Sequence, residues 1–382
     1  MKKSGFLKGA NTFFAALGLL AVASLIFLFI TNASGIATFL SVVGLVKSQS
    51  LHDIDANKII NGATAGIVDS LDDPYSKYLD KDTWQELKIR LDARFGGIGV
   101  YISQEKQGPL KVVAPIKGTP AFAAGVKHND IIMAINGETT AHMTQDEAAN
   151  LMRGEPGTQL VLTIYRESEE KEYEFKIIRE IINVPSVEDE VLDDNIPLGY
   201  INLNQFHAHS TGEMTKSVNY LIEEENVKGL ILDLRFNGGG DFEASIDIAS
   251  IFLDGDEVVS VVNGKGGKKS YSASKGKVDI PLVVIVNGDS ASAAEILAGA
   301  LQDNDRAILV GETTFGKGLV QTVFPLRDGG ALKLTTSKYF TPKGTDINEI
   351  GINPDYEVEV DKENGEDLQL KKAIEILKSQ IF

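Results

Sequence analysis

The chain has 382 residues, of which 43% are hydrophobic and 24% charged, and this balance excludes a disordered tail or a low-complexity polymer. At roughly 100–200 residues per domain, the length suggests two or three domains. The net charge of -17 would repel a phosphate backbone and argues against nucleic acid as a partner, and the absence of cysteine excludes disulfides, thiolate zinc sites and a cysteine nucleophile.

The amino terminus is predicted to be a membrane anchor. Apart from three lysines within the first eight residues, no charged side chain precedes Lys47, and residues 13–30 are dense in Phe, Leu, Ala and Ile. A spanning helix needs about 20 apolar residues, and the positive-inside rule leaves the chain after it outside the cytoplasm. The alternative is a cleaved signal peptide, because residues 31–35 are mostly small. We expect residues 1–46 to form an anchor and a juxtamembrane stretch.

Residues 47–93 are predicted to form a small helical segment. Apolar side chains recur at helical spacing from Ile59 to Leu71, and Pro74 should end that helix. A second helix should begin at Thr83, since Glu86 three residues later would complete a capping box. Two such helices cannot enclose a core alone. They are expected to pack on a later domain or on a second copy, as in a homodimer.

Residues 94–180 have the size and rhythm of a small β-rich module. The pair Asn136-Gly137 predicts a tight hairpin turn, and a short helix over residues 147–153 should end at Gly154. Four β-prone runs supply the strands: 99–102, 110–113, 130–135 and 160–165.

A glycine-rich sequence, Phe95-Gly96-Gly97-Ile98-Gly99-Val100, precedes the first of these strands. Successive backbone N–H groups there could converge on an anion. The alternative is a glycine-rich turn that only leads into a strand. Spacing alone does not decide between these two interpretations.

The motifs that follow this sequence resemble those of a PDZ domain in order and spacing: Gly118-Thr119-Pro120-Ala121, Ala124-Gly125-Val126-Lys127, Asn129-Asp130-Ile131-Ile132 and Ile135-Asn136-Gly137. The resemblance implies that the backbone of Gly97, Ile98, Gly99 and Val100 binds the terminal carboxylate of a peptide. The peptide would add as an extra strand at the sheet edge. Asn129 departs from the family's usual glycine, which should affect only a turn.

Residues 181–382 change to strands that alternate with longer helices, which indicates α/β layering. Two near-continuous apolar runs, 229–234 and 281–286, predict strands buried on both faces. Helices should follow over 241–253 and 291–303, and a last helix over 367–377. The glycine- and lysine-rich stretch 263–277 is predicted to be a mobile surface loop.

A nucleophile could lie in the segment Asn287-Gly288-Asp289-Ser290-Ala291-Ser292-Ala293-Ala294-Glu295, between a buried strand and a helix. A serine on such a turn can expose its hydroxyl, and the next N–H can point at an oxyanion. The alternative is helix capping, for which serine and aspartate are preferred. A Ser-His-Asp triad that uses His207 or His209 also stays open.

A candidate base is Lys317, which is bracketed by glycines and lies two residues after Phe315. To act near pH 7–8, its pKa must fall by about 3 units, and burial can do this. The alternative for a lysine in a glycine-rich loop is an ordinary solvated charge.

The combination of motifs from residue 229 onward resembles the tail-specific, or carboxyl-terminal processing, serine peptidases. The matching pieces are Leu232-Asp233-Leu234-Arg235, Asn237-Gly238-Gly239-Gly240, Ser290-Ala291-Ser292-Ala293-Ala294-Glu295-Ile296, Phe315-Gly316-Lys317-Gly318-Leu319-Val320-Gln321 and Tyr339-Phe340-Thr341-Pro342. The order of anchor, helical segment, PDZ module and catalytic domain is also that of the family. The resemblance therefore implies a multidomain α+β chain whose residues 181–382 form a layered, crotonase-like α/β peptidase domain.

The resemblance also implies roles for individual residues. Ser292 and Lys317 would form a Ser–Lys dyad that Gln321 helps to orient. The oxyanion hole would use the backbone N–H of Ala293 and one from Gly239 or Gly240. Two departures, Gly238 for a usual proline and Ala294 for a usual serine, remove neither member of the dyad.

The resulting hypothesis is a serine endopeptidase that is anchored by a single pass in a bacterial cell membrane and acts outside the cytoplasm. Its substrates would be proteins or peptides with accessible carboxyl termini, and no metal or organic cofactor is implied. The rival hypothesis is a catalytically silent PDZ scaffold or holdase that binds protein tails. Turnover of an unstructured peptide with an apolar carboxyl end separates the two.

Overall fold

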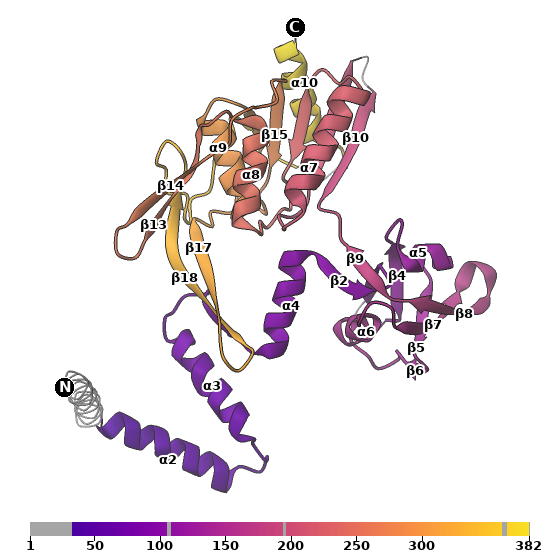
Figure 1. Ribbon diagram of the computed structural model, residues 1–382, viewed down its shortest axis with the longest axis vertical. Coiled ribbons are helices and arrows are strands. Elements are labelled where there is room, and N and C mark those ends of the chain that lie inside the picture. The colour runs from indigo at the N-terminus through magenta and orange to yellow at the C-terminus, as the bar shows by residue number, and fades with distance from the viewer. Residues whose placement is uncertain (1–32, 105–107, 194–195, 361–364, 382) are drawn as a thin grey trace, which may run out of the picture. The chain divides into compact units, whose positions relative to one another are not determined.

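The computed structural model describes residues 33–381, except 105–107, 194–195 and 361–364 (Figure 1). Its contacts divide the chain into two compact units, Met1–Tyr78 and Leu79–Phe382. The apolar run 13–30, predicted to be the membrane anchor, lies outside the described residues. Among the helices that are described, none combines the length and the apolar character needed to cross a membrane.

The described part of the first unit is mostly helical, and its second helix falls within the segment 47–93 where helices were predicted. It contains α2 (Ala33–Gln49) and α3 (Ala56–Asp69), and strand β1 (Lys77–Leu79) lies at its boundary. Helix α3 ends before Pro74, in agreement with the expected stop.

The second unit begins with α4 (Lys81–Asp92), and here the predicted start was wrong. The N-cap is Asp80, whose carboxylate accepts a hydrogen bond from the backbone N–H of Thr83 at 2.9 Å. A capping aspartate satisfies the same free N–H group that a capping box would use. Thr83 is therefore the third residue of the helix rather than its cap.

The β-rich module folds around a six-stranded antiparallel sheet with the order β3-β4-β5-β7-β8, and β6 pairs with β5. Helices α5 (Pro120–Ala124) and α6 (Gln145–Met152) pack against the sheet. A one-turn helix, η1 (Glu167–Glu169), joins β7 to β8. A two-stranded ribbon of β2 (Arg94–Gly97) and β9 (Glu180–Asn183) joins the module to its neighbours in sequence. The remaining strands are β3 (Val100–Gln104), β4 (Leu110–Pro115), β5 (Ile131–Ile135), β6 (Glu138–Thr139), β7 (Gln159–Arg166) and β8 (Lys171–Ile178).

Local sequence explains this module well. Asn136 and Gly137 both have positive φ, as the predicted tight turn between β5 and β6 requires. Thr144 and Glu147 form a reciprocal capping box that starts α6. Alternate side chains of β7, namely Leu160, Leu162 and Ile164, are fully buried in one hydrophobic core.

The peptidase-like region contains a second six-stranded sheet with the order β10-β11-β12-β15-β16-β19. All neighbours are parallel except β10, which is antiparallel to β11. Its strands are β10 (Val187–Asp193), β11 (Pro197–Leu203), β12 (Leu230–Asp233), β15 (Leu282–Val286), β16 (Ile308–Gly311) and β19 (Tyr356–Glu357).

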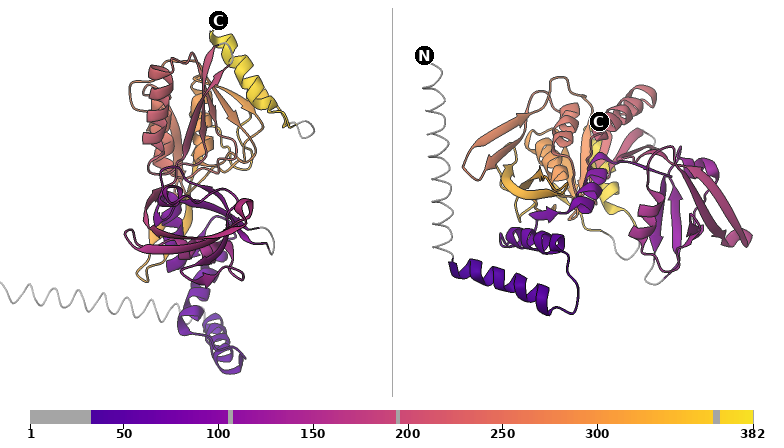
Figure 2. Two further views of the ribbon diagram at one scale, coloured as in Figure 1. Left: turned by 90° about the vertical axis from the view of Figure 1, so that its right-hand side faces the viewer. Right: turned by 60° about the horizontal axis from the view of Figure 1, so that its bottom comes forward.

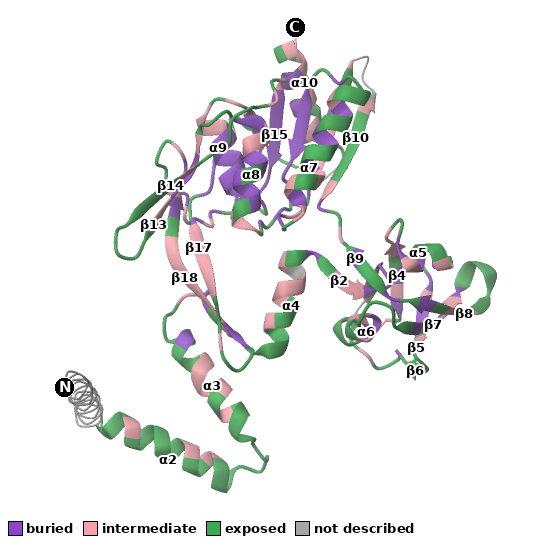
Figure 3. Cartoon of the chain, in the orientation of Figure 1, coloured by how far each residue is buried: buried purple, intermediate pink, exposed green. Residues whose placement is uncertain are grey.

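Helices cover both faces of this sheet, as the two buried apolar runs predicted (Figure 2). One face packs against α7 (Ser210–Asn219), its continuation η2 (Tyr220–Glu224), α8 (Phe242–Phe252) and α9 (Ala293–Asp303), and the other packs against α10 (Leu368–Ile381). Alternate residues of β15 enter the two cores: Val284 faces the first and Val283 the second. Figure 3 shows the continuous burial of this strand.

A separate antiparallel sheet contains β17 (Leu319–Pro325), β18 (Ala331–Phe340), β13 (Glu257–Asn263) and β14 (Lys268–Ser272). The expectation of a mobile loop over 263–277 was therefore wrong in part. Strand β14 pairs with β13 through a glycine-rich turn, and the pairing overrides the weak strand tendency of lysine and serine.

Candidate active site

Ser292 lies at the sharp turn between β15 and α9. Its backbone has φ +56° and ψ -115°, a conformation that costs a non-glycine residue on the order of 1–3 kcal/mol. The side chain is half-buried, and Ala293 begins the helix immediately afterwards. The first N–H groups of a helix have no intrahelical partner and carry partial positive charge. The turn therefore presents a serine hydroxyl beside helix N–H groups.

The buried carboxylate of Glu295 connects this turn to the lysine loop. Oε2 accepts hydrogen bonds from the backbone N–H of Ser292 at 2.8 Å and of Lys317 at 2.9 Å. Oε1 accepts from the Thr314 hydroxyl at 2.6 Å and the Gly316 N–H at 2.7 Å. One side chain thus fixes the backbone of both predicted dyad residues, a role that the sequence analysis did not assign.

Replacing Glu295 by glutamine should destabilise the protein by about 1–3 kcal/mol for each donor left without an acceptor. The amide keeps one acceptor oxygen, so the N–H groups on its other side lose their partner. Urea unfolding followed by circular dichroism measures the loss. Glu312→Gln, in the loop that carries Lys317, is the control and should unfold near the wild-type midpoint. An unchanged Glu295→Gln midpoint would contradict this account of the connection.

Lys317 is half-buried, and burial lowers the pKa of its ammonium group. The nearby positive charge of Lys333 lowers the pKa further, whereas Glu295 acts in the opposite sense. The flanking Gly316 has φ +85°, and a Cβ there would lie 2.9 Å from backbone nitrogen atoms of residues 350 and 351. The glycine therefore allows the lysine loop to pack closely against that segment.

The hydroxyl of Tyr339 also joins the two loops. Its Oη lies 2.5 Å from the Lys317 carbonyl oxygen and 3.1 Å from the Ser292 carbonyl oxygen. Tyr339 is fully buried, and burial raises its pKa well above the usual tyrosine value. It therefore stays protonated and acts as a donor.

Gln321 lies on β17, opposite Thr335 of β18. Its side-chain amide donates to the carbonyl oxygen of Leu319 at 3.2 Å. This bond holds the side chain close to its own strand.

The glycines predicted for the oxyanion hole lie against the serine turn. Gly239 has φ +92°, and a Cβ there would lie 2.8 Å from the Ser292 Cβ and 2.9 Å from the Ala293 nitrogen. Its own N–H donates to Oδ1 of Asn237 at 2.9 Å. Gly240 has φ +142°, and a Cβ there would lie 1.9 Å from the Phe206 carbonyl oxygen. Only glycine fits at either position.

Ser290, the other serine of the turn, is fully buried. Its hydroxyl donates to the Leu234 carbonyl oxygen at 2.8 Å and accepts from the Asn287 N–H at 3.0 Å. The first bond ties the turn to the end of β12 and the second closes the turn on the end of β15, so Ser290 has a structural role.

The contacts of the two candidate histidines are local. Nδ1 of the buried His207 accepts from the backbone N–H of His209 at 3.1 Å, and burial lowers the His207 pKa. Among the hydrogen bonds of the described residues, none joins either histidine to Ser292. The structure therefore gives no support to a triad.

The predicted carboxylate-binding residues line one groove of the β-rich module. The cavity of about 60 Å³ lies between β3 and α6, and its wall consists of Phe95, Gly97, Ile98, Gly99, Val100, Ile102, Ala149, Met152 and Arg153. The Arg153 guanidinium stacks 5.3 Å from the centre of the Phe95 ring. Sequence analysis missed this cation, although an arginine directly before the helix-ending Gly154 was a visible signal.

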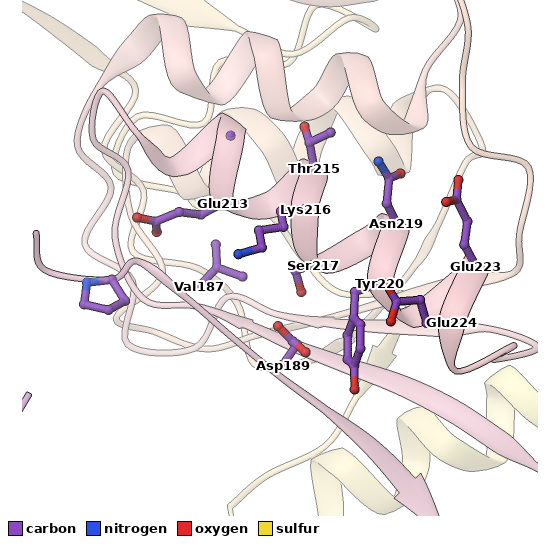
Figure 4. A pocket seen from close by; sticks show the side chains of 12 residues that line it. Val187, Asp189, Glu213, Thr215, Lys216, Ser217, Asn219, Tyr220, Glu223 and Glu224 are labelled. Carbon is purple, nitrogen blue, oxygen red and sulfur yellow. The ribbon is translucent and has the colours of Figure 1, made fainter. Parts of the chain in front are cut away.

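A larger groove, of more than ten times this volume, lies elsewhere. It has a volume of about 880 Å³ and is formed by α7, η2 and β10, with side chains such as Asp189, Lys216 and Glu223 on its wall (Figure 4). None of the predicted catalytic or carboxylate-binding residues lines it. The volume of a groove alone would therefore not have located the predicted catalytic residues.

Family models match three segments of the chain. A model of peptidase family S41 matches residues 197–358, a PDZ domain model matches 96–177, and a model of the activating protease CtpB N-terminal domain matches 31–83.

Similar proteins are known among carboxyl-terminal processing proteases. One from Bartonella bacilliformis is 39% identical over 333 residues, which cover 85% of this chain and 75% of that protein. Another, from Picosynechococcus, is 43% identical over 288 residues, 75% of this chain and 69% of that protein. The solved structure of a photosystem II D1 C-terminal processing protease is similar with a TM-score of 0.51 and 28% identity, and the match covers 92% of this chain and 93% of that one.

Proposed function

This chain belongs to peptidase family S41, the carboxyl-terminal processing serine peptidases, and we propose that it cleaves extracytoplasmic proteins with a Ser292–Lys317 dyad. The observation that carries the proposal is the Glu295 carboxylate, which binds the backbone of both residues. The lowered pKa of Lys317 supports it independently.

In the proposed reaction, the Ser292 hydroxyl oxygen attacks the scissile carbonyl carbon while neutral Lys317 accepts the hydroxyl proton. The resulting ammonium then protonates the leaving amine, and the acyl-enzyme remains. Lys317 next takes a proton from water as the water oxygen attacks the ester carbonyl carbon. The bond between that carbon and the Ser292 oxygen then breaks, and the Lys317 ammonium returns the proton to the Ser292 oxygen. Gln321 would orient the lysine amine.

The tetrahedral oxyanion would be held by the backbone N–H of Ala293 together with Gly239 or Gly240. The first N–H groups of α9 are suited to this because they lack intrahelical partners. The close approach of Gly239 to Ser292 supports the assignment. For the Gly239 N–H to donate to the oxyanion, its hydrogen bond to Oδ1 of Asn237 has to open.

The PDZ domain would bind the substrate's carboxyl terminus at Gly97, Ile98, Gly99 and Val100. The shared groove that these residues line supports this role, and Arg153 adds a positive charge to its wall. Charge-assisted hydrogen bonds to a carboxylate are about twice as strong as neutral ones. A terminal carboxylate should therefore bind better than a terminal amide.

Amidating the carboxyl terminus of a peptide substrate should lower kcat/KM by about tenfold, because a charge-assisted contact is lost. Initial rates on matched free and amidated peptides measure this difference in kcat/KM.

If the bound tail also favours the active arrangement of Ser292 and Lys317, a separate short peptide with a free apolar carboxyl end should stimulate cleavage of the amidated substrate. Flat or falling rates across the titration would reject this activation and leave docking alone.

We further propose that residues 1–46 anchor the protein in a bacterial cell membrane by a single pass, with the catalytic part outside, and that residues 47–93 contribute to a homodimer. The lysine-flanked apolar run supports the anchor, and the amphipathic α3 supports the dimer. Membrane fractionation and analytical ultracentrifugation of the full chain test the two proposals. A full chain recovered entirely in the supernatant would reject the anchor.

A further inference from the structure

The α7–β10 groove, which we define as the groove of about 880 Å³ between α7, η2 and β10, is acidic (Figure 4). Its wall carries one amine and four carboxylates: Lys216, Asp189, Glu213, Glu223 and Glu224. Within the described residues, none of these five side chains takes part in an ion pair. The excess of negative charge favours a positively charged ligand.

A buried hydroxyl in the wall of this groove has no hydrogen-bond partner among the described residues. It belongs to Ser217, which is only 5% exposed. Figure 4 shows its side chain directed from α7 toward β10, where Asp189 lies. Buried polar groups in native proteins are nearly always paired, so this exception requires an explanation. A ligand in the groove would supply the missing partner.

The helix beside the groove changes its hydrogen-bonding pattern at the same place. After Asn219, α7 continues as η2, which is a π-helix, and π-helices are rare and frequent at functional sites. Its first residue, Tyr220, is 40% exposed and donates its hydroxyl to Oε1 of Glu225 at 2.6 Å. That bond and, to a smaller extent, the charge of Asp189 raise the Tyr220 pKa. The exposed ring therefore lies near the Asp189 carboxylate.

Strand β10 offers backbone groups to the same ligand. It is the outer strand of its sheet, and of the described strands only β11 pairs with it. Val187 packs on the core beneath α7, whereas Leu192 packs on the core beneath α10. Because side chains alternate along a strand, Asp189 shares the α7 face with Val187, and Glu190 faces away from it. A strand added at the outer edge of β10 would direct alternate side chains toward the groove.

We propose that the α7–β10 groove docks an extended, arginine-containing segment of a partner protein, which pairs with the outer edge of β10 as an additional strand. A guanidinium group has five N–H donors and stacks on aromatic rings, so one arginine can pair with Asp189, donate to the Ser217 hydroxyl and lie over Tyr220. Charges on an edge strand often serve only to prevent aggregation. That role would not account for the unpaired hydroxyl of Ser217.

The docked segment is not the peptide that is cleaved, so this inference goes beyond the proposed function. An added strand would lie four strand spacings from β15, the strand that leads to Ser292, with β10, β11 and β12 between them. At about 4.8 Å for each spacing, the separation is about 19 Å. The groove would therefore hold a partner while the catalytic serine stays accessible.

The test uses fluorescence anisotropy to measure binding of a fluorescein-labelled hexapeptide of alternating threonine and arginine to the full chain carrying Ser292→Ala. Its carboxyl end is amidated, which removes the charge that the PDZ site would bind. The peptide should bind saturably. A lysine version should bind at least about 3-fold more weakly, because an ammonium group cannot make the same planar contacts. A version methylated at every backbone nitrogen should bind at least about 10-fold more weakly, because it cannot donate to β10.

Two variants and a control in the same background locate the peptide. Asp189→Asn should weaken binding about 10-fold, because charge-assisted hydrogen bonds are lost. Glu190→Gln removes the same charge from the opposite face of β10 and should change the Kd by less than about 2-fold. Ser217→Ala should weaken binding by about 3-fold or more, yet melt at the parent temperature or above it, because the lost hydroxyl is unpaired in the free protein.

The inference would be overturned by no saturable binding up to about 1 mM peptide, by equal binding of the three peptides, or by equal effects of Asp189→Asn and Glu190→Gln. A lower Tm in Ser217→Ala would assign that serine a structural role and count against the inference as well. In the wild type, saturating hexapeptide should leave the KM for a peptide substrate with a free carboxyl end unchanged. A KM that rises with hexapeptide concentration would place the groove on the substrate path and contradict the proposal. The binding results do not depend on the proposed peptidase activity, because Ser292→Ala is used.

Discussion

Ser292→Ala should lower the rate of peptide cleavage by at least about 1000-fold, because in the proposed reaction the acyl-enzyme forms on the Ser292 hydroxyl. The protein should remain folded, since Ser292 is only half-buried and its backbone bond to Glu295 does not involve the hydroxyl. The assay is the initial rate on an unstructured peptide with a free apolar carboxyl end.

Ser290→Ala is the matched control for this loss. Its hydroxyl is engaged with Leu234 and Asn287, so the substitution should cost about 1–3 kcal/mol of stability while leaving a measurable rate. Equal loss of activity in both variants, with folding intact, would contradict the assignment of Ser292. A wild-type chain that binds tails but never cleaves would favour the silent scaffold.

Lys317→Arg should be as inactive as Ser292→Ala, because a guanidinium group does not release its proton near neutral pH. In the wild type, burial and the charge of Lys333 both lower the Lys317 pKa. In the proposed dyad the neutral amine of Lys317 is the base, so kcat/KM should rise as the pH increases through this lowered pKa. The midpoint of that rise should lie below the ordinary lysine value.

Lys333→Gln tests whether the positive charge of Lys333 lowers the pKa of Lys317. Removing the positive charge removes one cause of the lowered Lys317 pKa, so the rise in kcat/KM should move to higher pH. Substituting His207 and His209 together should leave the midpoint unchanged. An active Lys317→Arg protein, or a midpoint that follows the histidines, would exclude the dyad.

The layered sheets could be predicted because their signals are local and redundant. The apolar runs of β12 and β15 are long enough to specify buried strands, and Asp241 is the expected cap of α8. Strand β14 was missed because its lysines and serines have little strand tendency, and only pairing with β13 places them in a sheet.

In the candidate site, too, the residues with a local sequence motif could be predicted, whereas contacts between residues distant in sequence could not. The candidates Ser292 and Lys317 followed from motifs, whereas the bonds of Glu295 to the backbone of Gly316 and Lys317 join residues 21 and 22 positions apart. A signal for Glu295 existed, since a serine followed three residues later by glutamate is a capping-box pattern.

Mapping the site of a fluorophosphonate probe by peptide mass spectrometry tests the central claim most directly, because the probe phosphonylates only an activated serine. The dyad predicts a single adduct on Ser292, whose formation accelerates as the pH rises, and strong suppression of labelling in Lys317→Arg. An adduct on Ser290 or another residue, or unchanged labelling in Lys317→Arg, would contradict it.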